Sequence, residues 1–289
     1  MTSARQPLQL GLHALVWVGD WTPRSAEHAI SSTAALGFDL IEVPLLDPST
    51  VDGAMTRRLL DEHGLGAACS LGLDPSADVS SEDPAVVARG RDLLGQAVDA
   101  AAEMGATDLC GVLYSVLAKY PAPLTDRSRA HVVESMAWLA DRAAGSGLRV
   151  NLEVVNRYET NVVNTTADML TLIGDTGADL GVHLDTYHMH IEENGMTEAV
   201  HQAVDAGRLR YVHVGESHRG YLGTGNVDFD TFCATLREVE YAGPVVFESF
   251  SSAVVHPTLS NQLAVWRNLW DDSEDLAKHA MAFLAERLR

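Results

Sequence analysis

The amino-acid sequence predicts an α/β fold, a single (β/α)8 barrel domain over residues 1–289. Short apolar runs rich in β-branched residues alternate with amphipathic stretches from one end of the chain to the other, which counts eight strand-then-helix units. The length fits one barrel, and no linker rich in Gly, Ser or Pro divides the chain. We therefore expect one domain with one core.

The eight predicted strands are bounded by Gly, Asp or Pro, which favour turns. In chain order they cover Leu10–Trp17, Asp39–Leu45, Gly66–Leu73, Asp108–Tyr114, Arg149–Val155, Leu180–Tyr187, Leu209–Glu216 and Pro244–Phe250.

Helices are predicted between the strands, for example over Pro84–Met104 and Arg127–Gly145, where Ala, Leu and charged residues recur at helical spacing. Gly37 and Gly105 each follow a helical stretch and precede a strand, as expected of left-handed C-caps. An open doubly wound sheet is the alternative fold. It is disfavoured because no glycine-rich phosphate loop follows the first predicted strand.

The C-terminal helical segment, about residues 259–289, is longer than one closing helix requires. It carries more apolar side chains than an exposed helix should. These are Trp266, Leu269, Trp270, Met281, Phe283 and Leu284. Two interpretations remain open, that the segment covers the barrel and that it lies at a subunit interface.

The charge of the chain limits its partners. Asp and Glu number 40 against 20 Lys and Arg, a formal net charge of −20. Such a surface repels phosphate backbones and anionic lipids. We expect a neutral small molecule as substrate, and neither nucleic acid nor a membrane as partner.

The cysteines and the apolar stretches indicate a cytoplasmic protein. Cys69, Cys110 and Cys233 are an odd number without paired spacing, so neither a disulfide framework nor a thiolate metal site is expected. No apolar stretch approaches the roughly 20 residues that cross a bilayer. Residues 1–7 lack the cationic and then apolar pattern of a signal peptide.

Four predicted strands in the second half of the chain each carry one ionisable side chain near their end. The four are Glu153, Asp185, His213 and Glu248. Such groups are costly in apolar strands unless they are paired or coordinated, and barrel chemistry lies at the carboxyl ends of the strands. Each acid taken alone could pair with an arginine. Together they indicate one divalent cation, and oxygen-rich ligation with one imidazole suits Mn²⁺, Mg²⁺ or Co²⁺.

Three further polar residues follow these candidate ligands at short spacing. Glu159 lies six residues after Glu153, His188 three after Asp185, and Arg219 six after His213. This spacing predicts that they lie in loops that leave the strands and reach over the metal. A solvated histidine cluster and a surface ion pair are the simpler interpretations of His188 and Arg219.

Four segments resemble the metal-dependent ketose 3-epimerases, a family that includes D-tagatose, D-allulose and L-ribulose 3-epimerases. The order and spacing of these segments match the pattern of the family, and the resemblance covers nearly the whole chain. The segments are Leu152–Asn161, His183–Glu193, His213–Gly220 and Phe247–Phe250.

The resemblance implies a (β/α)8 barrel that binds one divalent metal ion through Glu153, Asp185, His213 and Glu248. It assigns the two glutamates as catalytic acid and base, and it assigns substrate binding at carbons 1 and 2 of the sugar to Glu159, His188 and Arg219. Mn²⁺ is the first expectation for the metal, with Mg²⁺ or Co²⁺ as alternatives. A homodimer or homotetramer is expected. The candidates for lining the pocket are Trp17, Cys69, Tyr114 and Phe250.

The implied activity is inversion of carbon 3 of a free ketose through a cis-enediolate. The substrate pairs considered are D-fructose/D-allulose, D-tagatose/D-sorbose and L-ribulose/L-xylulose. An aldose–ketose isomerase of the same fold and a non-catalytic protein that binds sugar or metal are the alternatives. A barrel endonuclease acting on abasic DNA is disfavoured by the acidic charge.

Overall fold

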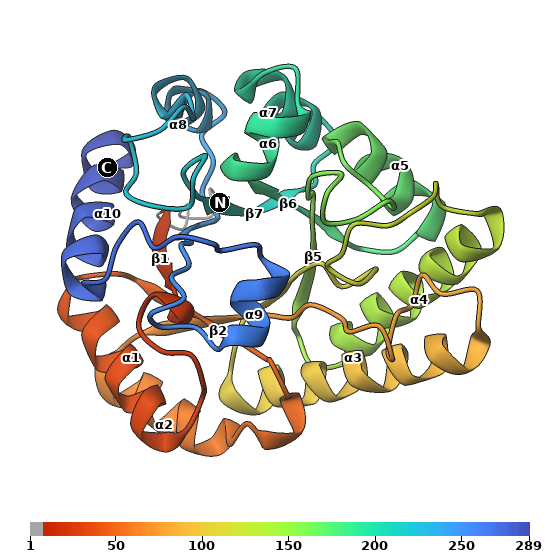
Figure 1. Cartoon of the computed structure of the whole chain (residues 1–289), viewed down its shortest axis with the longest axis horizontal. Helices are drawn as coiled ribbons and strands as arrows, with labels where there is room; N and C mark the ends of the chain where they lie inside the picture. The colour runs from red at the N-terminus through yellow and green to blue at the C-terminus, as the bar shows by residue number, and fades with distance from the viewer. Residues whose placement is uncertain (1–7) are drawn as a thin grey trace, which may run out of the picture.

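The computed structural model describes residues 8–289, in which eight parallel strands close into a barrel in chain order (Figure 1). The strands are β1 (Gln9–His13), β2 (Leu40–Pro44), β3 (Gly66–Ser70), β4 (Asp108–Gly111), β5 (Arg149–Glu153), β6 (Gly181–Asp185), β7 (Leu209–Val214) and β8 (Pro244–Phe247). Pairing of β1 with β8 closes the sheet. The fold prediction is confirmed. The segment for which the sequence predicts no signal peptide lies outside the described residues.

All eight strands lie within or close to the predicted ranges, but most of them end earlier than expected. After β1, Ala14–Val16 forms a 3-10 helix, and after β6 the side chain of Asp185 caps a helix that begins at Thr186. The apolar runs continue beyond the last ladder hydrogen bonds because the residues that follow the strands are also buried. The apolar runs in the sequence therefore indicate buried segments, and only part of each segment forms a strand.

The helices form a ring around the barrel (Figure 1). Their bounds are α1 (Pro23–Ala35), α2 (Gly53–His63), α3 (Pro84–Met104), α4 (Asp126–Ala144), α5 (Thr166–Thr176), α6 (Thr186–Glu192), α7 (Met196–Asp205), α8 (Phe229–Glu238), α9 (Pro257–Gln262) and α10 (Ser273–Leu288), and the 3-10 helices are η1 (Ala14–Val16) and η2 (Pro48–Thr50). Asp or Thr side chains cap the N-termini of most of the long helices. Gly37 and Gly105 have φ of 81° and 78°, as predicted for helix C-termini.

The C-terminal segment has two parts with different positions. Helix α10 packs on β1 and α8 and completes the outer ring, whereas the short α9 lies inside the ring of helices, over the barrel (Figure 1). Trp270 and Leu284 are buried, whereas Trp266 in the loop between the two helices is 74% exposed. Most of this apolar surface therefore covers the barrel. Within residues 8–289 no helix is long and apolar enough to cross a membrane.

The interior of the barrel is polar at both ends and apolar in the middle. At the start of β4, Asp108 accepts hydrogen bonds from Arg149 and Asn151. The layer above it is an apolar cluster of Leu40, Ala68, Cys110, Tyr211 and Val246. Toward the carboxyl ends of the strands the interior becomes acidic and rich in imidazole, which places the charged groups where the loops of the barrel can reach them.

Candidate active site

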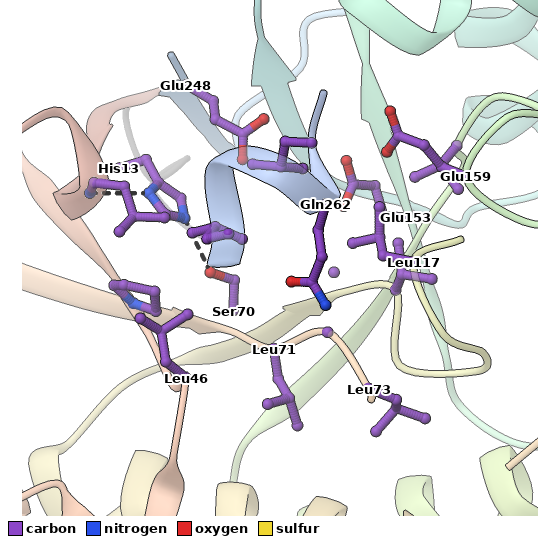
Figure 2. Close-up of a pocket in the computed structure, with 18 of the residues that line it drawn as sticks. His13, Leu46, Ser70, Leu71, Leu73, Leu117, Glu153, Glu159, Glu248 and Gln262 are labelled. Carbon is purple, nitrogen blue, oxygen red and sulfur yellow. Dashed lines mark hydrogen bonds between the residues drawn. The ribbon is translucent and has the colours of Figure 1, made fainter. Parts of the chain in front are cut away.

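A cavity of about 450 Å³ lies at the carboxyl ends of the strands. Seven residues singled out from the sequence line it, namely Glu153, Glu159, His188, His213, Arg219, Glu248 and Phe250. Figure 2 shows the carboxylates of Glu153 and Glu248 turned toward this cavity, with Gln262 of α9 beside them. Asp185 is fully buried just behind this surface.

The four expected metal ligands converge because β5 to β8 are neighbours in the barrel. Glu153 and Asp185 are the last residues of their strands, His213 pairs in register with Asp185, and Glu248 directly follows β8. His213 Nδ1 lies 3.6 Å from Glu248 Oε1 and 3.9 Å from Glu153 Oε1. Ligand atoms of Glu153, Asp185 and His213 all lie within 4.8 Å of one another.

Two of these ligand atoms are buried and have no hydrogen-bond partner, His213 Nδ1 and Asp185 Oδ2. A buried polar atom without a partner is costly, and such atoms are rare in folded proteins. Both belong to the group of side chains with metal-ligand spacing. Three carboxylates and one imidazole are a donor set for a hard or intermediate divalent cation, so the residues fit such an ion.

The imidazole of His213 is held from behind by Glu42, a residue that the sequence interpretation missed. Glu42 Oε2 lies 2.7 Å from His213 Nε2 and accepts a hydrogen bond of 2.7 Å from the hydroxyl of Tyr211. Glu42 Oε1 faces His13 Nε2 at 3.4 Å. The signal was present, since Glu42 is an acid inside the apolar run Leu40–Pro44, as Glu153 is in its own strand.

The pKa values of Glu42 and His213 shift in opposite directions. Burial opposes ionisation of Glu42, but attraction to His213 and His13 outweighs it and holds the pKa of Glu42 well below its ordinary value. Burial likewise opposes the charge on His213, yet Glu42 and Glu248 raise its pKa to about 10. Without a cation, the ring of His213 is therefore protonated at neutral pH. A cation that binds Nδ1 takes the place of that proton.

The two glutamates of the cavity have raised pKa values. Burial is the main cause for both, and it raises the pKa of Glu248 to about 7 and that of Glu153 well above its ordinary value. Neighbouring carboxylates add to the effect, and His213 opposes it. A bound cation would stabilise the ionised forms. In the metal-free protein both carboxyl groups therefore keep a proton to higher pH than an exposed glutamate does.

Arg219 reaches over the site from the loop after β7. Its guanidinium lies 3.1 Å from Glu248 and 3.4 Å from Glu159, and it stacks over the ring of Tyr187 at 4.0 Å and that of Phe250 at 5.0 Å. These contacts fix the plane of the guanidinium at the cavity that Arg219 lines.

The backbone of Arg219 is held in the left-handed region, with φ of 58°. Its carbonyl accepts a hydrogen bond of 2.6 Å from the hydroxyl of Ser249, which in turn accepts one of 2.7 Å from the indole of Trp270. The C-terminal segment therefore supports the position of a cavity residue.

His188 presents a hydrogen-bond donor to the cavity. Its Nδ1 accepts hydrogen bonds from the backbone N–H of Asn156 at 3.1 Å and from the amide of the same residue at 2.8 Å. Burial lowers the pKa of His188 to about 3, so the ring is neutral and carries its proton on Nε2. That nitrogen lies 3.6 Å from Glu153 and 3.9 Å from Glu159.

The chain is similar to known proteins over nearly its whole length. Residues 30–287 match the model of the xylose isomerase-like TIM barrels. An L-ribulose 3-epimerase from Methylomonas sp. (strain DH-1) is 53% identical over 281 residues, 97% of this chain and 98% of the relative. A ketose 3-epimerase from Arthrobacter globiformis is 52% identical, over 97% of each chain. The chain belongs to the ketose 3-epimerases.

Solved structures of this family have the same architecture. The crystal structure of a D-allulose 3-epimerase from Methylomonas sp. superimposes with a TM-score of 0.95 at 52% identity and covers 100% of both chains. A structure of an L-ribulose 3-epimerase gives a TM-score of 0.94 at 41% identity, over 97% of this chain and 94% of the other. The family is one of carbohydrate epimerases, and the ligand set described above agrees with its dependence on a metal.

Of the four candidates for lining this epimerase pocket, Phe250 lines the cavity and the other three do not. Trp17 lies behind it, where its indole donates a hydrogen bond to Thr33 at 2.9 Å, because the 3-10 turn after β1 carries the chain away. Cys69 is buried with its sulfur 3.3 Å from that of Met104. Tyr114 donates a hydrogen bond of 2.7 Å to the carbonyl of Glu153, which supports the end of β5 from outside the cavity.

The opposite end of the cavity is rich in leucine, which the sequence interpretation did not predict. Its side chains come from the loops that follow the early strands and from the segment around α9. They are Leu46, Leu71, Leu73, Leu117, Leu259 and Leu263. Loops have no periodic pattern that would show which way a leucine points, so their position after β2, β3 and β4 was the only available signal.

Proposed function

We propose that the protein inverts carbon 3 of free ketoses, with one divalent cation held by Glu153, Asp185, His213 and Glu248. The observation that carries the proposal is the pair of glutamates that line one cavity, with carboxylate oxygens 3.9 and 3.6 Å from the unpartnered nitrogen of His213. Epimerisation needs two proton-transfer groups on opposite faces of one carbon.

The proton on carbon 3 is weakly acidic because the neighbouring carbonyl takes up the negative charge of the enediolate. A cation bound between the four ligands would supply Lewis-acid stabilisation of that charge. One glutamate removes the proton from one face and the other delivers a proton to the opposite face. In the reverse reaction the roles exchange, so both must be able to hold and release a proton.

Glu159, His188 and Arg219 are proposed to bind the oxygens at carbons 1 and 2. Arg219 supplies charged donors, the Nε2 proton of His188 is a neutral donor, and Glu159 is an acceptor held by Asn156 at 3.1 Å and by Arg219. Together they present both kinds of partner that a hydroxyl group requires. Fixing this end of the sugar brings carbon 3 to the glutamates.

The charges of the cavity favour an unphosphorylated sugar. Among the described residues that line it, the only cationic side chain of fixed charge is Arg219, which is already paired with Glu159 and Glu248. Asp47 and Asp74 add further negative charge. A phosphate would face carboxylates without a basic cradle. We therefore propose D-fructose/D-allulose, D-tagatose/D-sorbose and L-ribulose/L-xylulose as the substrate pairs.

The proposed metal is Mn²⁺, with Mg²⁺ or Co²⁺ as alternatives. Three carboxylates with one imidazole suit these ions, and no thiolate belongs to the set. The three cysteines are buried and unpaired in the structure, which supports a reducing compartment such as the cytoplasm.

We propose that residues 1–289 form one domain and that copies of the chain associate as a homodimer or homotetramer. Trp266 is 74% exposed in the C-terminal segment, and tryptophan is enriched at interfaces between subunits. Light scattering coupled to size exclusion would measure the mass of the particle. A parent protein that is monomeric at micromolar concentration would contradict this part of the proposal.

The decisive experiment incubates the metal-stripped protein with each ketose, with and without Mn²⁺, Mg²⁺ or Co²⁺, and separates the products by chromatography. We expect D-allulose from D-fructose, only with metal, and loss of product when chelator is added. Glucose or mannose as the product would indicate an aldose–ketose isomerase. No chelator-sensitive product from any ketose would favour a binding protein.

A further inference from the structure

We propose that Glu42 is a positioning residue for the metal centre, which fixes the orientation and protonation of the ligand His213. The inference rests on the metal site of the proposed function, and it assigns a role to a residue that contacts neither the cation nor the sugar.

Glu42 reaches His213 across the interior of the barrel. It lies on β2, whose neighbours in the sheet are β1 and β3, whereas His213 lies on β7. Both side chains are buried, and the distance of 2.7 Å between Glu42 Oε2 and His213 Nε2 is that of a short hydrogen bond. This contact joins a residue of β2 to an expected metal ligand on β7.

Every group around Glu42 is a donor. The hydroxyl of Tyr211 donates to Oε2. His13 Nδ1 accepts the backbone N–H of Leu15 at 3.2 Å, which leaves the proton of a neutral His13 on Nε2, facing Glu42 Oε1 at 3.4 Å and Ser70 Oγ at 3.1 Å. Tyr211 and His213 both contact Oε2, and Oε1 has no hydrogen-bond partner. A carboxylate only accepts hydrogen bonds, so His213 donates to Glu42 from Nε2.

This hydrogen bond leaves His213 Nδ1 as the nitrogen that can bind a cation. Nδ1 is the atom that faces Glu153 and Glu248 and has no hydrogen-bond partner. A carboxylate behind an imidazole fixes its ring and increases its strength as a ligand. In Glu42→Gln the side-chain amide can donate to Nε2 instead, which would put the proton on Nδ1 and block the metal.

The test measures Mn²⁺ affinity by calorimetry in metal-stripped protein without any sugar. Glu42→Gln is expected to weaken binding by about 10- to 100-fold, the usual effect of losing a partner of a ligating histidine. Tyr211→Phe is the matched control, because it removes another hydrogen bond to the same oxygen without touching His213. It should change the affinity by less than about threefold.

An unchanged affinity in a folded Glu42→Gln protein, or an equal loss in Tyr211→Phe, would overturn the proposal. A second measurement uses the parent protein, so the decision does not depend on whether Glu42→Gln folds. Long-range ¹H–¹⁵N spectra of the histidines after Zn²⁺ loading should show His213 protonated at Nε2 and not at Nδ1. The opposite pattern would reject the role of Glu42. A parent that binds Mn²⁺ with this dependence yet epimerises no ketose would reject the proposed function alone.

Discussion

The two ends of the cavity differ in chemistry and in origin. The metal end is built by the last four strands, with three carboxylates and an imidazole at their carboxyl ends. The other end is lined by leucines from the loops after β2, β3 and β4 and from the α9 segment. Residues at strand ends are fixed by ladder hydrogen bonds, whereas loop leucines restrict the substrate only by shape.

The two ends of the cavity should therefore select the substrate with different strictness. At the metal end, two of the side chains are oriented by a second residue, His213 by Glu42 and His188 by Asn156. At the leucine end, the leucine side chains offer no hydrogen bonds to the hydroxyl groups on carbons 4 to 6, and the polar side chains among them are Asp47, Asp74 and Gln262. We expect a strict requirement at carbons 1 to 3 and a looser one beyond.

The largest expected effect comes from breaking the metal end. Glu153→Gln or Glu248→Gln should lower kcat for D-fructose by about 10²- to 10⁴-fold with saturating Mn²⁺, because each substitution removes one of the two proton-transfer groups. Glu198→Gln on α7, an exposed acid, is the matched control and should have no effect. Near-parental turnover in either cavity variant with metal bound would exclude that glutamate as acid or base.

A smaller effect is expected from Arg219, which contacts both Glu159 and Glu248. Arg219→Lys keeps the charge but loses the stacking on Tyr187 and Phe250 and the paired contacts with two glutamates. We expect KM for the ketose to rise by about 10- to 100-fold with a lesser change in kcat. Arg157→Lys, an exposed ion pair with Glu192, is the control. Unchanged kinetic constants for Arg219→Lys would remove its proposed role.

The leucine end should respond in selectivity more than in rate. Leu46 is 53% exposed at the cavity, so Leu46→Ala should fold normally. It should change the ratio of kcat/KM for D-fructose to that for L-ribulose by up to about tenfold, because only the larger sugar reaches this end. Ile191→Ala, an exposed apolar residue elsewhere, serves as control. An equal fall for both sugars would show that the two ends are not separate in function.

The smallest expected effect is on how the unfolding free energy of the metal-free protein depends on pH. Burial raises the pKa of Glu248 to about 7, above that of the unfolded chain, so the folded protein holds a proton that the unfolded chain has lost between about pH 5 and 7. The contribution of Glu248 to stability therefore falls as pH rises through this window. Gln carries no such proton, so metal-free Glu248→Gln should gain unfolding free energy relative to the parent from pH 5 to 8. Chemical denaturation of both proteins measures the difference, and a constant offset would contradict it.

The sequence predicted the metal end better than the leucine end for a physical reason. An ionisable residue inside an apolar run is unusual at any position, so Glu153 and Asp185 could be identified without coordinates. Glu42 had the same signal, but its importance depends on a contact across the barrel with a residue 171 positions away. Trp17 was a pocket candidate from the family resemblance, but the strand ends at His13 and the 3-10 turn that follows carries the chain away.

The three cysteines are all buried, and burial raises the pKa of each thiol above its ordinary value. Thiolates are the reactive form, so the folded protein should react slowly with maleimides. One cysteine introduced at an exposed position, such as that of Trp266 or Gln262, would then be the single fast-reacting site. A chain with a cysteine in place of Gln262 would thus carry one dye or spin label beside the cavity without prior removal of its own cysteines.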